Sequence, residues 1–207
     1  MSEEYWSAVT AVRLQIAELL DTLSAQEWEA QSLCTQWRVR DVAGHVALVP
    51  TITTWQLLSV APRAGFNLHR MNTLIAQRAG SEPTDSIVTK LRQHAADQTT
   101  ARVLNVADSL FDVVVHSQDI ARPLGRTLAV PADYTRAGLE RVWTMGWPFN
   151  AKKKLAGLRL TATDTDWTVG AGPEITGSAM ALLLLLTGRT ATVTNELHGT
   201  GVTRLSP

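Results

Sequence analysis

Apolar side chains recur every three or four positions through roughly the first 120 residues, the spacing of helices that bury one face. Four stretches carry this spacing, over residues 3–23, 67–79, 84–110 and 106–121. A further helix opens near Trp37 after a polar link and carries His45 on its apolar stripe, until Pro50 kinks or ends it. Pro123 and Gly125 stop the last helix. The pattern therefore predicts a helical bundle.

Beyond Gly125 the pattern becomes that of a small mixed unit. Alternating apolar and polar residues predict strands over residues 158–163 and 167–169, and helical spacing covers residues 132–147 and 176–186. We expect the boundary near residues 124–130. The sequence thus predicts a mainly α protein, with a four-helix bundle over residues 1–126 and a small α+β domain over residues 127–207.

Composition narrows the classes of function. Nearly half of the 207 residues are hydrophobic, and 19 Lys and Arg balance 19 Asp and Glu. A packed core is therefore expected, and neither nucleic acid nor a membrane is an expected partner, because no basic surface or long apolar segment is present. The chain starts without the pattern of a secretory signal, and its single cysteine, Cys34, cannot form an internal disulfide. We expect a cytoplasmic protein that takes a small-molecule substrate.

The residues that could carry chemistry are two histidines and one aspartate. Asp112 and His116 lie four apart on the predicted last helix, so both face one side. A carboxylate buried in a bundle is normally paired, neutralised or bound to a metal. His45, between small residues on another helix, supplies a third donor. Two histidines and one carboxylate would hold a divalent metal and leave positions open for water or substrate.

Spacing alone also fits a structural interpretation. Asp112 and His116 could form an ordinary helix-surface pair, with His45 bonded to a backbone carbonyl in the core, and the pattern favours neither alternative. Cys34 lacks a neighbouring basic residue or histidine in the sequence and is interpreted as packing. The remaining histidines are expected to face solvent; they are His69, His94 and His198. The tryptophans are expected to wedge helices together or to support a homodimer; they are Trp28, Trp37, Trp55, Trp143, Trp147 and Trp167.

Two stretches, residues 32–46 and 112–125, resemble the mycothiol-dependent maleylpyruvate isomerase family, a branch of the DinB-like metalloproteins. Residues 183–189 resemble the end of that family's small C-terminal domain. The resemblance implies that His45, Asp112 and His116 hold the metal, for which zinc is expected. The family's pattern has glutamate where this chain has Asp112. Asp119 could then assist, as an acceptor for His116 or for a bound water.

The resemblance also implies an activity, that of a thiol transferase or isomerase that uses mycothiol as cosubstrate. A metal with an open position can hold a thiol as thiolate, which would attack a small electrophile. An acidic substrate would need a cationic anchor, for which Arg78 is the first candidate, beside Arg63 and Arg70.

Two other functions remain open. The small domain resembles sterol-carrier-like folds and could bind an apolar ligand through its very apolar helix, while the metal site is structural or vacant. Two histidines and one carboxylate would also suit non-haem iron chemistry with oxygen. Metal identity separates that third possibility from thiol chemistry.

Overall fold

The computed structural model describes residues 2–98 and 106–205. The chain forms two compact units, residues 1–129 and residues 130–207, and each is described by itself. Within the described residues, no helix is both long and apolar enough to cross a membrane.

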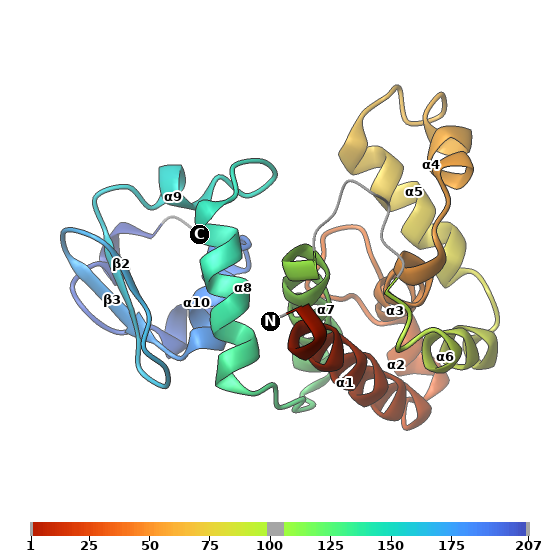
Figure 1. The fold of residues 1–207 in the computed structure, drawn as a ribbon, viewed down its shortest axis with the longest axis horizontal. Coiled ribbons are helices and arrows are strands. Elements are labelled where there is room, and N and C mark those ends of the chain that lie inside the picture. Colours follow the sequence, from red (N-terminus) through yellow and green to blue (C-terminus); the bar gives the residue numbers. More distant parts are fainter. Residues whose placement is uncertain (1, 99–105, 206–207) are drawn as a thin grey trace. The chain divides into compact units, whose positions relative to one another are not determined.

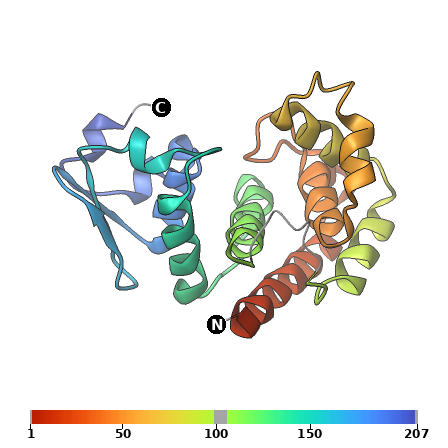
Figure 2. The same cartoon turned by 45° about the horizontal axis from the view of Figure 1, so that its top comes forward.

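The first unit is built from helices (Figures 1 and 2). They are α1 (Ser2–Asp21), α2 (Ala25–Glu29), α3 (Val39–Leu48), α4 (Thr54–Val60), α5 (Leu68–Gly80), α6 (Thr84–Gln93) and α7 (Val106–Ala121), with 3₁₀ turns at Val49–Thr51 and Arg122–Leu124. Helix α1 packs along α7, and α3 packs against α5, α6 and α7. The apolar faces of α1, α3 and α7 are buried between them, with Ile16, Val42 and Val114 fully covered. Burial of these faces is the main source of the unit's stability.

Helices α3 and α5 cross at two glycines. A Cβ on Gly44 would lie 2.5 Å from the backbone nitrogen of Gly80 and 2.6 Å from the carbonyl carbon of Ala79. A Cβ on Gly80 would in turn collide with Asp41 and the Arg40 carbonyl. Gly44 therefore lets the two backbones touch, and this close approach fixes the position of the next residue on α3, His45.

The end of α6 is held by a buried arginine. Arg13 on α1 is 3% exposed, and its guanidinium donates to the carbonyl oxygens of His94, Ala95 and Asp97 at 3.0–3.4 Å. The spacing that runs through residues 84–110 predicts one continuous helix there. In the structure α6 ends at Gln93, because the carbonyls that follow bond to Arg13 and turns replace the helix. Part of the predicted helix, residues 99–105, lies outside the described residues.

The second unit contains a three-stranded sheet covered by helices (Figure 1). Its elements are α8 (Ala132–Thr144), α9 (Ala151–Lys154), β1 (Arg159–Ala162), β2 (Thr168–Gly170), β3 (Glu174–Gly177), α10 (Ala179–Leu186) and α11 (Thr190–Val193), with 3₁₀ turns at Thr194–Glu196 and Val202–Arg204. The strand order is β2-β1-β3. Leu160 in β1 pairs with Val169 of antiparallel β2 and with Ile175 of parallel β3. Helix α10 packs on α8 and on the sheet.

The predicted fold class is confirmed, with corrections to single elements. The helix predicted over residues 176–186 begins only at Ala179, because Thr176 and Gly177 belong to β3 and the Ser178 side chain caps the helix that follows. All five leucines of α10 are at most 5% exposed, so core packing explains its apolar sequence. Two tryptophans do not wedge helices: Trp55 is 80% exposed and Trp147 is 58% exposed.

Candidate metal centre

The three predicted ligands meet in the first unit. The imidazole of His45, from α3, and the side chains of Asp112 and His116, from α7, each offer a donor atom within 4.8 Å of the others. His45 Nε2 lies 3.6 Å from Asp112 Oδ2, and His116 Nε2 lies 3.4 Å from Asp112 Oδ1. The histidine side chains are 12% and 10% exposed, and the aspartate is 31% exposed. The group is thus shielded by the bundle and open on the carboxylate side.

The spacing of these donors fits a shared cation better than a direct hydrogen bond between imidazole and carboxylate. A charge-assisted hydrogen bond between imidazole and carboxylate is about 2.7–2.9 Å long, shorter than the two contacts here. Ligands about 2.0–2.1 Å from a tetrahedral zinc ion lie about 3.3–3.4 Å from one another. The contacts of 3.4 and 3.6 Å to Asp112 are close to that separation. Two nitrogens and a carboxylate are also a donor set that zinc and other first-row divalent metals accept.

Asp119 fixes the orientation of His116. Its Oδ2 lies 2.8 Å from His116 Nδ1, and its side chain is 0% exposed. Because a carboxylate only accepts, the ring donates its Nδ1–H there and leaves Nε2 to face Asp112. A ligating histidine whose other nitrogen bonds to a carboxylate is a recurring arrangement around protein-bound metals. This contact is one of the two that the sequence analysis left open for Asp119.

Cys34 lies beside this pair, which corrects its interpretation as simple packing. Its thiol donates to Asp119 Oδ2 at 3.1 Å, and its sulfur is 3.9 Å from His116 Nδ1. The loop before α3 brings it there, since the Leu33 backbone N–H donates to the Asp119 carbonyl. The sequence could not show this, because Cys34 and His116 are 82 positions apart. Cys34, His116 and Asp119 form a second group that could hold a metal, but it shares His116 with the first.

Trp37 packs against both histidines. Its ring centroid lies 5.2 Å from that of His45 and 5.8 Å from that of His116, with the latter pair stacked. The two imidazoles meet edge to face at 4.9 Å. Trp37 is 5% exposed, and its indole N–H reaches the Thr73 hydroxyl on α5 at 3.4 Å. It therefore limits the rotation of both rings, a role that helix wedging does not capture.

Asp112 and His116 each stabilise the charged form of the other. Burial alone would raise the pKa of Asp112, but His116 and His45 beside it hold that pKa well below its usual range. Burial alone would lower the pKa of His116, but Asp112, Asp119 and Cys34 raise it well above its usual value. Without a metal the group is therefore an ion pair, and a divalent cation would take the place of the imidazolium proton.

A small apolar cavity adjoins His45. Its volume is about 100 Å³. Besides His45 it is lined by residues of α3, of the turn that follows and of α5: Leu48, Val49, Ile52, Leu68, Met71, Asn72 and Ile75. The cavity is thus a space beside the metal centre in which part of a substrate could lie.

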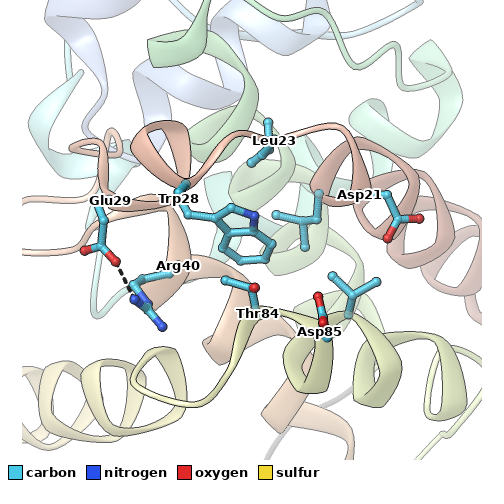
Figure 3. Close-up of a pocket in the computed structure, with 10 residues that line it drawn as sticks. Asp21, Leu23, Trp28, Glu29, Arg40, Thr84 and Asp85 are labelled. Atoms are coloured by element: carbon cyan, nitrogen blue, oxygen red, sulfur yellow. Dashed lines mark hydrogen bonds and ion pairs between the residues drawn. The ribbon is translucent and has the colours of Figure 1, made fainter.

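Two larger cavities, each of about 310 Å³, are lined by none of the three candidate ligands. Figure 3 shows one of them, with the indole of Trp28 between the Glu29–Arg40 ion pair on one side and the carboxylates of Asp21 and Asp85 on the other. Its charged walls differ from those of the cavity beside His45.

The other polar residues singled out by the sequence lie outside the centre. Arg63, Arg70 and Arg78 are exposed, and none of them lines the cavity beside His45. His69 and His198 are exposed as expected, whereas His94 is partly covered and pairs with Asp97 at 2.7 Å.

Comparison with known proteins identifies a family for the first unit. Residues 9–110 match the family model described as the mycothiol maleylpyruvate isomerase N-terminal domain. Residues 9–110, within the N-terminal unit, thus form a domain of this family. The resemblance found in the sequence is therefore confirmed. No curated protein matches the chain.

Two solved structures extend the likeness to the whole fold of this family. They are crystal structures of the mycothiol-dependent maleylpyruvate isomerase and of a histidine-to-alanine mutant of it. Their TM-scores are 0.65 and 0.67, at 15% and 14% sequence identity, and each match covers 100% of this chain and 95% of the other. Both units therefore have counterparts in the DinB-like maleylpyruvate isomerase fold.

The resemblance in the sequence led us to expect glutamate at position 112, where this chain has aspartate. The shorter side chain still places its two oxygens 3.4 and 3.6 Å from the two imidazole Nε2 atoms. Asp112 is thus long enough to join the two histidines in a three-donor group.

Proposed function

We propose that the protein is a metal-dependent enzyme of the cytosol that uses mycothiol as a cosubstrate and acts on a small electrophile, as an isomerase or an S-transferase. His45, Asp112 and His116 would hold the metal, and zinc is the ion that we expect. The observation that carries the proposal is the convergence of three donor atoms within 4.8 Å beside a cavity. The family match supplies the thiol and the reaction class.

A divalent metal bound there would supply a Lewis acid that favours the thiolate form of a thiol at neutral pH. The protein's own residues have separate tasks. Asp119 keeps His116 Nε2 directed at the site, and Trp37 restrains both imidazoles. The apolar walls beside His45 exclude water from the electrophile, which slows hydrolysis and side reactions.

The thiolate would attack an activated carbon–carbon double bond. A C–S bond forms, the π bond breaks, and its electron pair moves onto the conjugated carbonyl oxygen, while the thiol proton has already passed to solvent. Rotation about the resulting single bond and expulsion of the thiolate give an isomer, and the thiol is regenerated. If the intermediate carbon takes up a proton instead, the product is a stable thioether and the thiol is consumed.

Metal content is the first test. Protein purified without chelator or histidine tag is measured by elemental mass spectrometry, as wild type and as the double variant His45→Ala, His116→Ala. The matched control is His198→Ala, which removes an exposed histidine of the second unit. We expect near-stoichiometric zinc in wild type and control, and none in the double variant. A wild type that is metal-free and cannot take up added zinc contradicts the proposal and favours a non-catalytic binding protein.

Thiol chemistry is the second test. The zinc-loaded protein is mixed with mycothiol and an electrophilic alkene, and the free thiol and products are followed by mass spectrometry. Isomerised alkene with constant thiol indicates an isomerase, and a thioether with falling thiol indicates a transferase. Stoichiometric iron that consumes oxygen, with no thiol dependence, would replace the proposal with oxygen chemistry.

A further inference from the structure

The walls of the cavity beside His45 are uncharged apart from that histidine. Helix α5 presents Leu68, Met71, Asn72 and Ile75 to it, residues spaced three and four apart on one face. Residues 48, 49 and 52 close it from the other side with aliphatic side chains. Among its lining residues in the described part of the chain there is no arginine, lysine, aspartate or glutamate.

None of the arginines on α1 or α5 lines the cavity. Arg70 and Arg78 lie on α5 but are exposed and do not line the cavity. Arg13 is buried, but it donates to three backbone carbonyls at the end of α6. Moving a carboxylate from water to such walls without a cation is costly. Asp112 and a thiolate would together neutralise a divalent ion at the centre, so the metal would leave no net charge to hold a second anion.

From these walls we infer that the cavity selects electrophiles with an uncharged apolar group, such as esters or ketones, over dicarboxylates. The inference rests on the proposed function and names the substrate class of the same site. The volume of about 100 Å³ limits the group. An apolar cavity of about 150 Å³ holds one benzene molecule, so this one has room for a short alkyl or alkoxy group next to the reacting double bond.

Binding can be tested without any reaction. Dimethyl succinate and succinate share a saturated carbon skeleton that no thiolate can attack, and they differ in charge. The protein is labelled at its methionine methyl groups with ¹³C and titrated with each compound, with and without zinc. Met71 lines the cavity, whereas Met145 and Met180 lie in the second unit and serve as internal controls. We expect the diester to shift the Met71 signal with at least tenfold higher affinity than succinate.

A charge added at the rim should reverse part of this preference. Asn72 is exposed and lines the cavity, so Asn72→Arg adds a cation there without filling the core. His69→Arg adds the same group to the same helix at an exposed position outside the lining, and is the matched control. An exposed ion pair contributes roughly 0.2–1 kcal/mol, so we expect succinate to bind about 1.4- to fivefold more tightly to the Asn72 variant only.

The outcomes separate this inference from the proposed function. If succinate shifts Met71 in wild type as strongly as the diester, or if neither does, the inference is wrong. If the diester shifts Met71 but the protein holds no metal and transfers no thiol, the cavity selects as inferred and the proposed function fails. Turnover then gives an independent check. The catalysed rate with each substrate is divided by its uncatalysed rate with the same thiol, and this ratio should be larger for dimethyl maleate than for maleate.

Discussion

Replacing Gly44 with alanine should destabilise the first unit, although glycine-to-alanine changes inside helices are usually favourable. The new Cβ would lie 2.5 Å from the Gly80 backbone nitrogen, 2.6 Å from the Ala79 carbonyl carbon and 2.9 Å from the Gly80 Cα. All three are backbone atoms, so no side chain can rotate away. To reach an ordinary contact of 3.4 Å, α3 and α5 must separate locally by about 0.9 Å.

The two opposing effects can be compared. Removing a glycine from a helix interior contributes about 0.8–1 kcal/mol, and overpacking a close-packed interface costs about 1–3 kcal/mol. Because the obstacle is backbone, we expect the upper part of that range, which leaves a net loss of about 1–2 kcal/mol. The same displacement moves His45 relative to α7, so zinc affinity should fall as well.

Urea unfolding of the metal-free protein, followed by far-UV circular dichroism, measures the first effect, and competition with a chromophoric chelator measures the second. Gly146→Ala is the control, since its Cβ would meet only Asn150 Oδ1, at 3.9 Å. We expect that variant to stay within about 1 kcal/mol of wild type. A Gly44 variant as stable as wild type, with unchanged zinc affinity, would show that the crossing does not set the position of His45.

Three further predictions follow from single contacts. Asp119→Asn should weaken zinc binding about 10–100-fold in the same chelator competition. Unchanged affinity would show that Asp119 does not contribute to metal binding. The Ser24 backbone and side chain and Arg126 lower the pKa of Glu27 to about 2. The contribution of Glu27 to stability is therefore present above the unfolded pKa near 4.5 and lost as pH falls towards 2. Carboxyl ¹³C NMR should give a higher pKa for Glu27 in Arg126→Met. An unchanged Glu27 pKa would exclude the ion pair. Leu183→Ala, at a residue with 0% exposure, should cost about 2–5 kcal/mol in urea unfolding, and a change below about 1 kcal/mol would contradict tight packing of α10.

The sequence predicted what local periodicity encodes. The spacing of Asp112 and His116 on a helix of residues 106–121 reappears as α7, and the apolar stripe that carries His45 reappears in α3. Both depend on residues three or four apart, so no knowledge of the tertiary fold was needed. Residue type and position made His45 the candidate third donor, and the family resemblance favoured that choice, because nothing in the spacing shows which faces of α3 and α7 meet.

Features that depend on long-range contacts were missed. Cys34 reaches Asp119 through a loop in which Gln36 has a φ of 70°, a backbone conformation that its sequence does not suggest. Strand β3 has four residues and gains its hydrogen bonds from parallel pairing with β1, so it carries no strong pattern of its own. The sequence shows Gly44 only as a small residue before His45, whereas in the structure it is the point where two backbones touch.

The contact of Trp37 with both imidazoles gives the protein a built-in fluorophore at its candidate metal centre. Indole emission is quenched by a protonated imidazole nearby, and His45 and His116 lie 5.2 and 5.8 Å from the Trp37 ring. Exchange of the imidazolium proton for a cation should therefore brighten this one residue. In a chain whose other tryptophans are replaced by phenylalanine, binding and release of the metal could be followed in real time without any added dye.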